Sequence, residues 1–305
     1  MNREDFSFAS TIDGLEIACY RWSSTARPRG IVQIAHGMGE HALRYDYFAT
    51  VLSNAGFQVY ANDHRGHGRT ARRPDSLGDF GDGGWNALVT DLVTLTGLAA
   101  TRDDGLPRDS GLPRDSGLPR DSRLPIVLLG HSMGSFAAQQ YILDHSRLIA
   151  GVALSGSVAV DKLTFDSSRP TDLSSLNRGI ENPRTSFDWL SRDPAAVDAY
   201  VADPRCGFGV NARAVQSMAA TAPRLADPAE LRRIRPDLPI YIFAGDRDPL
   251  NRGLEWLKPV AERYRAAGVR NVAEKYYPGG RHEMLNEINR GEVIEDFQNW
   301  LRDIL

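Results

Sequence analysis

Short runs of mainly apolar residues alternate with segments of helical spacing along most of the chain. The runs are compact and rich in β-branched residues, which is typical of strands buried on both faces of a parallel sheet. They lie at 31–35, 57–61, 126–129, 149–154, 240–244 and 272–277. Apolar residues recur at helical intervals in 41–55, 85–101, 133–146, 253–267 and 285–304. Strands that alternate with helices in this way predict an α/β fold with a mostly parallel, doubly wound sheet.

Two regions depart from the alternation. The opening segment has Gly14 after Asp13 between two strand-like stretches, which predicts an antiparallel hairpin. Residues 157–236 separate two predicted core strands and have helical and loop character, and they are too long for an ordinary connection. We therefore expect a core formed by 1–156 and 237–305, with 157–236 inserted as a helical cap over the strand ends, where open α/β sheets bind ligands.

A hexapeptide repeat interrupts the predicted core. GLPRDS occurs at 105–110, again at 111–116 and a third time at 117–122. Each unit consists mainly of Gly, Pro and charged residues and has no apolar face that could stack on its neighbour. The repeats at 105–122 therefore predict a flexible surface loop, not a solenoid.

Composition excludes several classes of protein. The formal net charge of -3 implies no broad basic face, so nucleic acid is not an expected partner. The start MNREDFSF has no apolar run of a secretory signal, and no stretch reaches the roughly 18 apolar residues of a membrane span. Cys19 and Cys206 lie far apart without metal-ligand spacing, so we expect reduced thiols, no metal site and a cytoplasmic location.

Residues 130–134 read GHSMG, a G-x-S-x-G pentapeptide centred on Ser132. The motif directly follows the apolar run 126–129 and directly precedes a helical segment. This strand–turn–helix setting places a serine on a strained turn with its hydroxyl exposed. Glycines flank such a turn because it leaves no room for side chains. We predict that Ser132 is a nucleophile.

A serine hydroxyl needs a base that accepts its proton, and in this arrangement the base is a histidine after the last strand. His282 lies in GGRHEML, between the run 272–277 and the final helical segment. Gly279 and Gly280 give that loop the freedom to turn the imidazole toward the serine. His282 is therefore the predicted base.

An acid is expected after the preceding strand. The run 240–244 leads into Gly245-Asp246-Arg247-Asp248-Pro249, so two carboxylates compete for the role. Asp248 stands at the outer part of the turn, where its side chain can reach a histidine, whereas Asp246 suits bracing of the turn. We predict Asp248 as the acid, which gives the chain order Ser…Asp…His.

Backbone amides must stabilise the negative charge that develops on the substrate carbonyl oxygen. One donor should be the residue after the nucleophile, Met133. The other should come from the loop after 31–35, which reads His36-Gly37-Met38-Gly39, and Met38 is the candidate. The two glycines allow close approach of the substrate, and we interpret His36 as a structural brace of this loop.

The motifs together resemble the monoacylglycerol lipase and lysophospholipase-like (serine aminopeptidase-like) branch of the α/β-hydrolases. The matching stretches are HGMGEHALRY at 36–45, DHRGHGRT at 63–70, GHSMG at 130–134, AGDRDPLN at 244–251, GGRHEMLNE at 279–287 and, in the cap, LSRDPAAVDAYVADP at 190–204. The resemblance implies the α/β-hydrolase fold and the same assignments for Ser132, Asp248, His282, Met38 and Met133. It also implies a structural role for Asp63, Arg65 and His67. The GLPRDS repeats depart from the family pattern.

The expected function is serine-dependent hydrolysis of monoacylglycerol-like monoesters through an acyl-enzyme, without a cofactor. The expected binding partner is a small-molecule ester, and the sequence also allows transient contact of the cap with a membrane. Alternatives are a small aromatic or dicarboxylic monoester of the phthalate type, a lysophospholipid, an aminopeptidase substrate, or ligand binding without catalysis. Asp at position 132 would be expected of an epoxide hydrolase or dehalogenase, so Ser132 argues against both.

Substrate choice should reside in the cap. The candidate contact residues are Gly37, Phe165, Trp189, Phe208 and Met218, with Phe187 and Tyr200 as further aromatic candidates. Each cap aromatic also suits the cap's own core. A cap arginine could hold a carboxylate or phosphate of the substrate. The arginines in question are Arg169, Arg178, Arg184, Arg205, Arg213 and Arg224.

Overall fold

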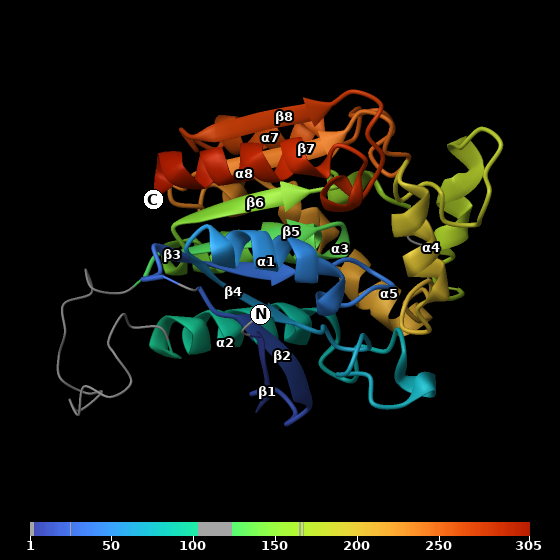
Figure 1. Cartoon of the computed structure of the whole chain (residues 1–305), viewed down its shortest axis with the longest axis horizontal. Coiled ribbons are helices and arrows are strands. Elements are labelled where there is room, and N and C mark those ends of the chain that lie inside the picture. Colours follow the sequence, from blue (N-terminus) through green and yellow to red (C-terminus); the bar gives the residue numbers. More distant parts are fainter. Residues whose placement is uncertain (1–2, 25, 103–123, 165, 167) are drawn as a thin grey trace.

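An eight-stranded sheet forms the centre of the protein in the computed structural model, which describes residues 3–24, 26–102, 124–164, 166 and 168–305 (Figure 1). Its strands are β1 (Arg3–Ala9), β2 (Glu16–Trp22), β3 (Gly30–Ala35), β4 (Phe57–Asn62), β5 (Ile126–His131), β6 (Gly151–Ser155), β7 (Ile240–Gly245) and β8 (Val272–Tyr277). The spatial order is β1-β2-β4-β3-β5-β6-β7-β8. The predicted GLPRDS loop at 105–122 lies outside the described residues.

Strand directions match the α/β prediction. β1 pairs antiparallel with β2, as the predicted hairpin requires, and β2 pairs antiparallel with β4. All the remaining neighbours are parallel. The strands β3 to β7 are buried along their whole length, which explains why each reads as a mainly apolar run. The prediction of a strand buried on both faces was wrong for 272–277, because β8 lies at the edge of the sheet and most of its residues are only half-buried.

Helices cover both faces of the sheet. Phe48 of α1 and Phe297 of α8 belong to the apolar cluster on one face, whereas Trp85 of α2, Tyr141 of α3 and Tyr264 of α7 belong to the other. The bounds are α1 Asp46–Asn54, α2 Gly84–Arg102, α3 Met133–His145, α7 Lys258–Ala266 and α8 Arg290–Ile304. The two separate clusters confirm that the sheet is wound on both sides. No helix in the described ranges combines the length and the apolar character needed to cross a bilayer.

Two predicted helices begin later than their apolar spacing suggests. The segment expected at 253–267 becomes helical only at Lys258, because Arg252 and Leu254 have positive φ values of 51° and 74° that no α-helix accommodates. The segment expected from 285 starts with the 3₁₀ turn Met284–Asn286, and α8 begins at Arg290. Hydrophobic periodicity does not report such backbone reversals.

The described part of the region predicted as a cap holds three short α-helices in addition to several 3₁₀ turns. They are α4 (Pro194–Ala202), α5 (Ala212–Ala219) and α6 (Pro228–Leu231), each preceded by an Asp or Asn that accepts a hydrogen bond from the first turn. In Figure 1, α4 and α5 lie at the right-hand end of the molecule, at the side toward which the parallel strands point. The inserted segment thus lies beside the carboxyl ends of the strands.

The order of the strands creates a crevice at this end. From β3 the chain continues to β4 on one side and then to β5 on the other, so the winding reverses next to β3. Ligands bind at such a switch point in open α/β sheets. Ala35 pairs with Gly130, so the loop after β3 and the turn after β5 begin side by side.

Candidate active site

Ser132 occupies the sharp turn between β5 and α3. Its backbone has φ 50° and ψ -122°, a conformation that residues other than glycine rarely adopt. The turn is held because the Ser132 amide donates to the Ser155 carbonyl at 2.9 Å and the Ser135 amide donates to the Ser132 carbonyl at 2.8 Å. A strained serine directly after a buried strand is the nucleophile-elbow geometry expected from the sequence.

The glycines that flank the elbow are sterically required. A Cβ on Gly130 would lie 2.4 Å from the Gly134 carbonyl oxygen, and one on Gly134 would lie 2.1 Å from the Ala35 carbonyl oxygen. The atoms in the way belong to the backbone and cannot move aside as a side chain could. The elbow therefore packs directly against the end of β3.

Replacing Gly134 with alanine should destabilise the protein by about 3 kcal/mol or more, at the upper end of the cost of overpacking a core. We expect a clear fall in Tm by differential scanning fluorimetry. The matched control is Gly97→Ala in α2, where an added Cβ meets nothing within 4 Å. That change should stabilise the protein by about 1 kcal/mol through helix propensity. Equal Tm values for the two variants would contradict the close packing at the elbow.

The structure places Asp248, and not Asp246, against the predicted base. His282 Nδ1 lies 2.8 Å from Asp248 Oδ2, and the two side chains are 2% and 0% exposed. The other carboxylate oxygen of Asp248 accepts the Leu250 amide at 2.9 Å. Asp246 instead accepts the Gly279 amide at 2.7 Å and so ties the turn after β7 to the histidine loop. With Nδ1 engaged by Asp248, Nε2 of His282 is the nitrogen left to face Ser132.

Charge around His282 favours its protonated form. Burial acts to lower the pKa of His282, but the Asp248 carboxylate, with Glu283 and Glu40, raises it above the usual value. The neighbouring His131 ring lies 4.8 Å away, and burial together with His282 lowers the pKa of His131 to about 4. His131 is therefore neutral and does not compete for the proton.

The loop after β3 presents the predicted oxyanion donors. The Gly37 amide donates to Glu40 Oε1 at 2.5 Å, so it is already engaged. By contrast, the amides of Met38 and Met133 have no hydrogen-bond partner among the described residues, and both residues line the cavity that holds Ser132. Met133 is the first residue of α3, where backbone N–H groups are free by geometry. These two amides are the pair that the sequence predicted.

His36 braces the same loop. Its Nε2 accepts the His64 amide at 2.9 Å, so Nδ1 carries the proton and donates to the Gly37 carbonyl at 2.8 Å. Burial, and then the neighbouring His64, keep the pKa of His36 far below its usual value. His36 therefore stays neutral and structural, as its position in the sequence suggested.

Sequence reasoning missed a buried ionic network beside the site. Arg44 Nη1 lies 2.8 Å from Glu40, and the Arg44 guanidinium also forms a two-point contact with Glu283, in which Nη2 lies 2.7 Å from Oε2. The Arg44 guanidinium stands 4.7 Å above the Tyr200 ring. Glu40, Tyr200 and Glu283 line the cavity. The only sequence signal was the presence of charged residues in two motifs, Glu40 and Arg44 in HGMGEHALRY and Glu283 in GGRHEMLNE.

Changing Glu283 to glutamine should move the acidic limb of the pH–activity profile to lower pH. Only neutral His282 can accept a proton, so activity rises as pH increases through the pKa of His282. Glu283 raises that pKa, and its neutralisation lowers it toward the usual value. The measurement is kcat/KM for a neutral ester against pH. Glu292→Gln, a change in the first turn of α8, is the control and should leave the limb in place. An unmoved limb in Glu283→Gln would disprove the electrostatic role.

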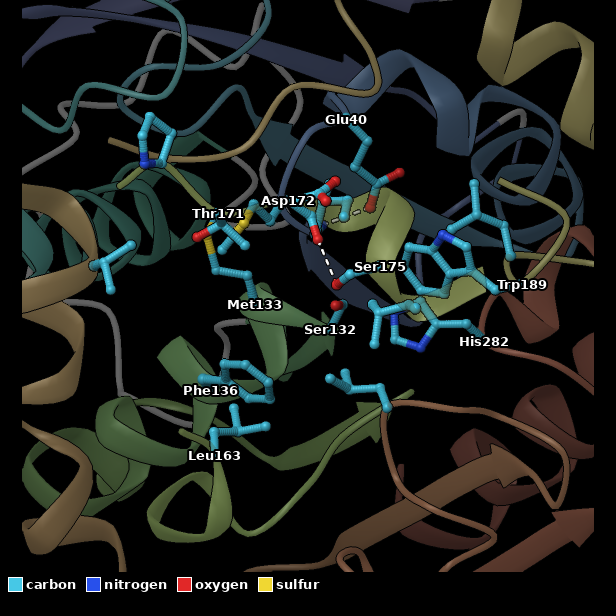
Figure 2. Close-up of a pocket in the computed structure, with 18 of the residues that line it drawn as sticks. Glu40, Ser132, Met133, Phe136, Leu163, Thr171, Asp172, Ser175, Trp189 and His282 are labelled. Carbon is cyan, nitrogen blue, oxygen red and sulfur yellow. Dashed lines mark hydrogen bonds between the residues drawn. The ribbon is translucent and has the colours of Figure 1, made fainter. Parts of the chain in front are cut away.

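A cavity of about 370 Å³ surrounds Ser132 and His282 (Figure 2). Of the residues predicted to contact substrate, Gly37, Trp189 and Met218 line it. Phe208 is not among the described residues that line the cavity, because its ring packs against the His67 ring at a centroid distance of 5.0 Å. Phe165 lies outside the described residues. Tyr200 lines the cavity, whereas Phe187 packs 5.1 Å from the Tyr200 ring.

Two of the cap arginines reach the cavity. Arg169 and Arg178 line it, although Arg169 also pairs with the surface carboxylate of Asp166 at 2.9 Å. Arg184 and Arg213 pair with surface carboxylates at 2.7 and 2.8 Å. Arg224 likewise pairs with Asp144 and Glu230.

For the described residues, the one group of side chains with metal-ligand spacing is His41, Asp203 and Cys206, whose ligand atoms lie within 4.8 Å of one another. His41 Nε2 and Asp203 Oδ2 are 2.8 Å apart and so satisfy each other.

The eight-stranded sheet, with a serine elbow at the end of β5 and a histidine after β8, defines an α/β-hydrolase. The chain belongs to the family described as "Serine aminopeptidase, S33", whose pattern matches residues 26–289. This confirms the family resemblance that the motifs indicated.

Relatives specify the kind of hydrolase. The chain is 32% identical to a monoacylglycerol lipase of Mycolicibacterium smegmatis, over 98% of this chain and 97% of that one. It is 25% identical to the human monoglyceride lipase, over 94% of this chain and 89% of that one. The structure of a thermostable carboxyl esterase from Bacillus coagulans in complex with glycerol superposes with a TM-score of 0.84 at 29% identity, over 100% of this chain and 99% of that one. The protein is a carboxylic ester hydrolase that acts on small-molecule esters.

Proposed function

We propose that this protein hydrolyses monoacylglycerols, with Ser132 as nucleophile, His282 as base and Asp248 as the acid that orients it. The observation that carries the proposal is the two-sided character of the cavity. Ser132 lies between a polar end with Glu40 and an apolar end with Phe136 and Leu163 (Figure 2). An ester that joins a hydroxyl-rich alcohol to a hydrocarbon chain matches both ends.

The reaction begins with proton transfer. His282 Nε2 accepts the proton of the Ser132 hydroxyl as the oxygen attacks the ester carbonyl, and Asp248 stabilises the resulting imidazolium. The amides of Met38 and Met133 donate to the carbonyl oxygen as it becomes negative. The carbonyl–alkoxy bond then breaks, the alcohol leaves with the proton from His282, and the acyl group stays on Ser132.

Water completes the cycle. A water molecule gives a proton to His282 and attacks the acyl-enzyme, and Ser132 leaves with that proton as the fatty acid forms. Each step uses the same base and the same pair of amides, so no cofactor is needed. The polar end formed by Glu40, Tyr200 and Glu283 is where we expect the glycerol hydroxyl groups to bind.

The apolar end should select the acyl chain. Six described residues, drawn from the core and from the predicted cap, provide apolar surface there. They are Met133, Phe136, Leu163, Val215, Met218 and Leu250. Burial of each methylene of an acyl chain contributes about 0.8 kcal/mol, so a long chain is favoured over a short one until the cavity is filled.

The test is fatty-acid release from a long-chain monoacylglycerol beside hydrolysis of p-nitrophenyl butyrate. We expect turnover of both, with the higher kcat/KM on the monoacylglycerol. Hydrolysis of the short ester alone would overturn the lipid assignment and favour a phthalate-type monoester. Arg169 and Arg178 could pair with a carboxylate or a phosphate, so a phthalate monoester and a lysophospholipid complete the panel.

Two further expectations accompany this function. We propose a cytoplasmic location, and the two free thiols Cys19 and Cys206 are compatible with it. Transient contact of the cap with a lipid surface stays a prediction, and in the described part of 157–236 the exposed large hydrophobic side chain is Val201, at 51%. One such residue supports weak contact, which co-sedimentation with phosphatidylcholine vesicles would measure.

A further inference from the structure

The loop that carries His282 is held largely by the predicted cap. The loop leaves β8 at Tyr277 and reaches α8 only at Arg290, with a single 3₁₀ turn between. Alongside it runs a cap segment, 188–192, that is about ninety residues away in sequence. We call the two facing segments, 188–192 and 281–288, the cap–histidine seam.

Backbone hydrogen bonds join the two sides of the seam next to the imidazole. The Glu283 amide donates to the Leu190 carbonyl at 2.7 Å, and the His282 amide donates to the Trp189 carbonyl at 3.4 Å. The Trp189 ring lies 4.8 Å from the His282 ring at an interplanar angle of 43° (Figure 2). The cap thus contacts both the backbone and the ring of His282.

Glu287 is the centre of the seam. Its side chain is fully buried, and one oxygen accepts the amides of Arg192 and Arg281 at 3.1 and 3.0 Å. The other accepts Arg192 Nε and the Ile288 amide, both at 2.9 Å. A buried carboxylate that accepts four N–H groups fixes the relative positions of all of them.

Further contacts prevent the two segments from sliding. Arg281 Nη1 donates to the carbonyls of Asp188 at 2.6 Å and Ser191 at 3.1 Å. Ser191 Oγ donates in return to the Asn286 carbonyl at 2.9 Å. Arg281 and Glu287 therefore hold the cap segment from either side of His282.

We propose that Glu287 is a positioning residue for the reaction, which fixes His282 against Asp248 by tying the histidine loop to the cap segment 188–192. The inference rests on the proposed function, because it assigns His282 the role of base. The cap then contributes to proton transfer as well as to substrate binding. A displacement of about 1 Å in a catalytic group can cost about a hundredfold in rate, so a seam of this kind affects kcat directly.

Glu287→Gln is the main test. Glutamine keeps the size of the side chain, but its NH₂ group must face two N–H donors and cannot accept from them. We expect kcat for p-nitrophenyl butyrate to fall about 10- to 100-fold with little change in KM. The reaction of Ser132 with a fluorophosphonate probe should slow by a similar factor, and titration with the probe counts the folded sites.

The pH profile separates positioning from simple destabilisation. Asp248, Glu283, Glu40 and His131 are the titratable groups that face His282. If the contact with Asp248 loosens in Glu287→Gln, the pKa of His282 falls and the acidic limb moves to lower pH. Loss of stability alone lowers Tm and the number of active sites but leaves this limb in place.

Two variants complete the design. Arg192→Met removes the contact between the Arg192 side chain and Glu287, but the Arg192 amide can still donate to Glu287. The fall in kcat and the shift of the acidic limb should therefore both be smaller than in Glu287→Gln. Arg213→Met removes another ion pair between cap and core, to Asp82 at 2.8 Å, and should change neither kcat nor the limb. Wild-type kcat and pH profile per titrated site in Glu287→Gln would overturn the proposal. If Ser132→Ala retained activity, the proposed function itself would fail, so the two failures are distinct.

Discussion

Replacing Ser132 with alanine is expected to reduce ester hydrolysis about 10⁴- to 10⁶-fold, to what binding and the oxyanion donors supply alone. Alanine keeps the Cβ and fits the elbow, so the fold should be unchanged. The change removes the oxygen that attacks the carbonyl, and no acyl-enzyme can form. The measurements are kcat/KM for p-nitrophenyl butyrate and for a long-chain monoacylglycerol, with Tm as the check on folding.

Ser175 provides the matched control for this prediction. It also lines the cavity, but its hydroxyl donates to the Asp172 carbonyl at 2.7 Å, at the start of its own 3₁₀ helix (Figure 2). Ser175→Ala should therefore keep nearly all activity. The opposite ranking, with an active Ser132→Ala enzyme and an inactive Ser175→Ala enzyme, would refute the assignment of the nucleophile.

The fold and the arrangement of the proposed catalytic residues were predictable because local sequence determines them. Mainly apolar runs indicate the parallel strands, and the residues that follow each run lie at the same edge of the sheet. Ser132, Asp248 and His282 all follow such runs. Their identity therefore depends only on motif and chain order, and the 2.8 Å contact between Asp248 and His282 agrees with that expectation.

The surroundings of the site were not predictable in the same way. Arg44 meets Glu283 across 239 positions of sequence, and Arg192 meets Glu287 across 95. No local period reports a pairing of that kind. The aromatic side chains of the cap present the same difficulty, because spacing does not decide whether a ring such as that of Phe208 faces the cavity or packs against the core.

Asp248→Asn is the second change expected to have a large effect, a loss of about 10⁴-fold in kcat. Oδ1 of Asp248 accepts the Leu250 amide at 2.9 Å, so the asparagine carbonyl should take that place. The asparagine NH₂ group then faces His282 Nδ1 and forces the proton of the imidazole onto Nε2. In that tautomer His282 cannot accept the proton of Ser132, although the shape of the site is unchanged.

The neighbouring acid makes the experiment decisive. Asp246 is on the same turn, and its Oδ1 accepts the Gly279 amide at 2.7 Å, a bond that an asparagine carbonyl can also accept. Asp246→Asn should therefore stay close to the wild-type rate, while Asp248→Asn regains activity only as pH rises and hydroxide replaces the missing base. Similar losses in both variants would mean that the turn after β7 matters for its shape alone, and that Asp248 does not act through the tautomer of His282.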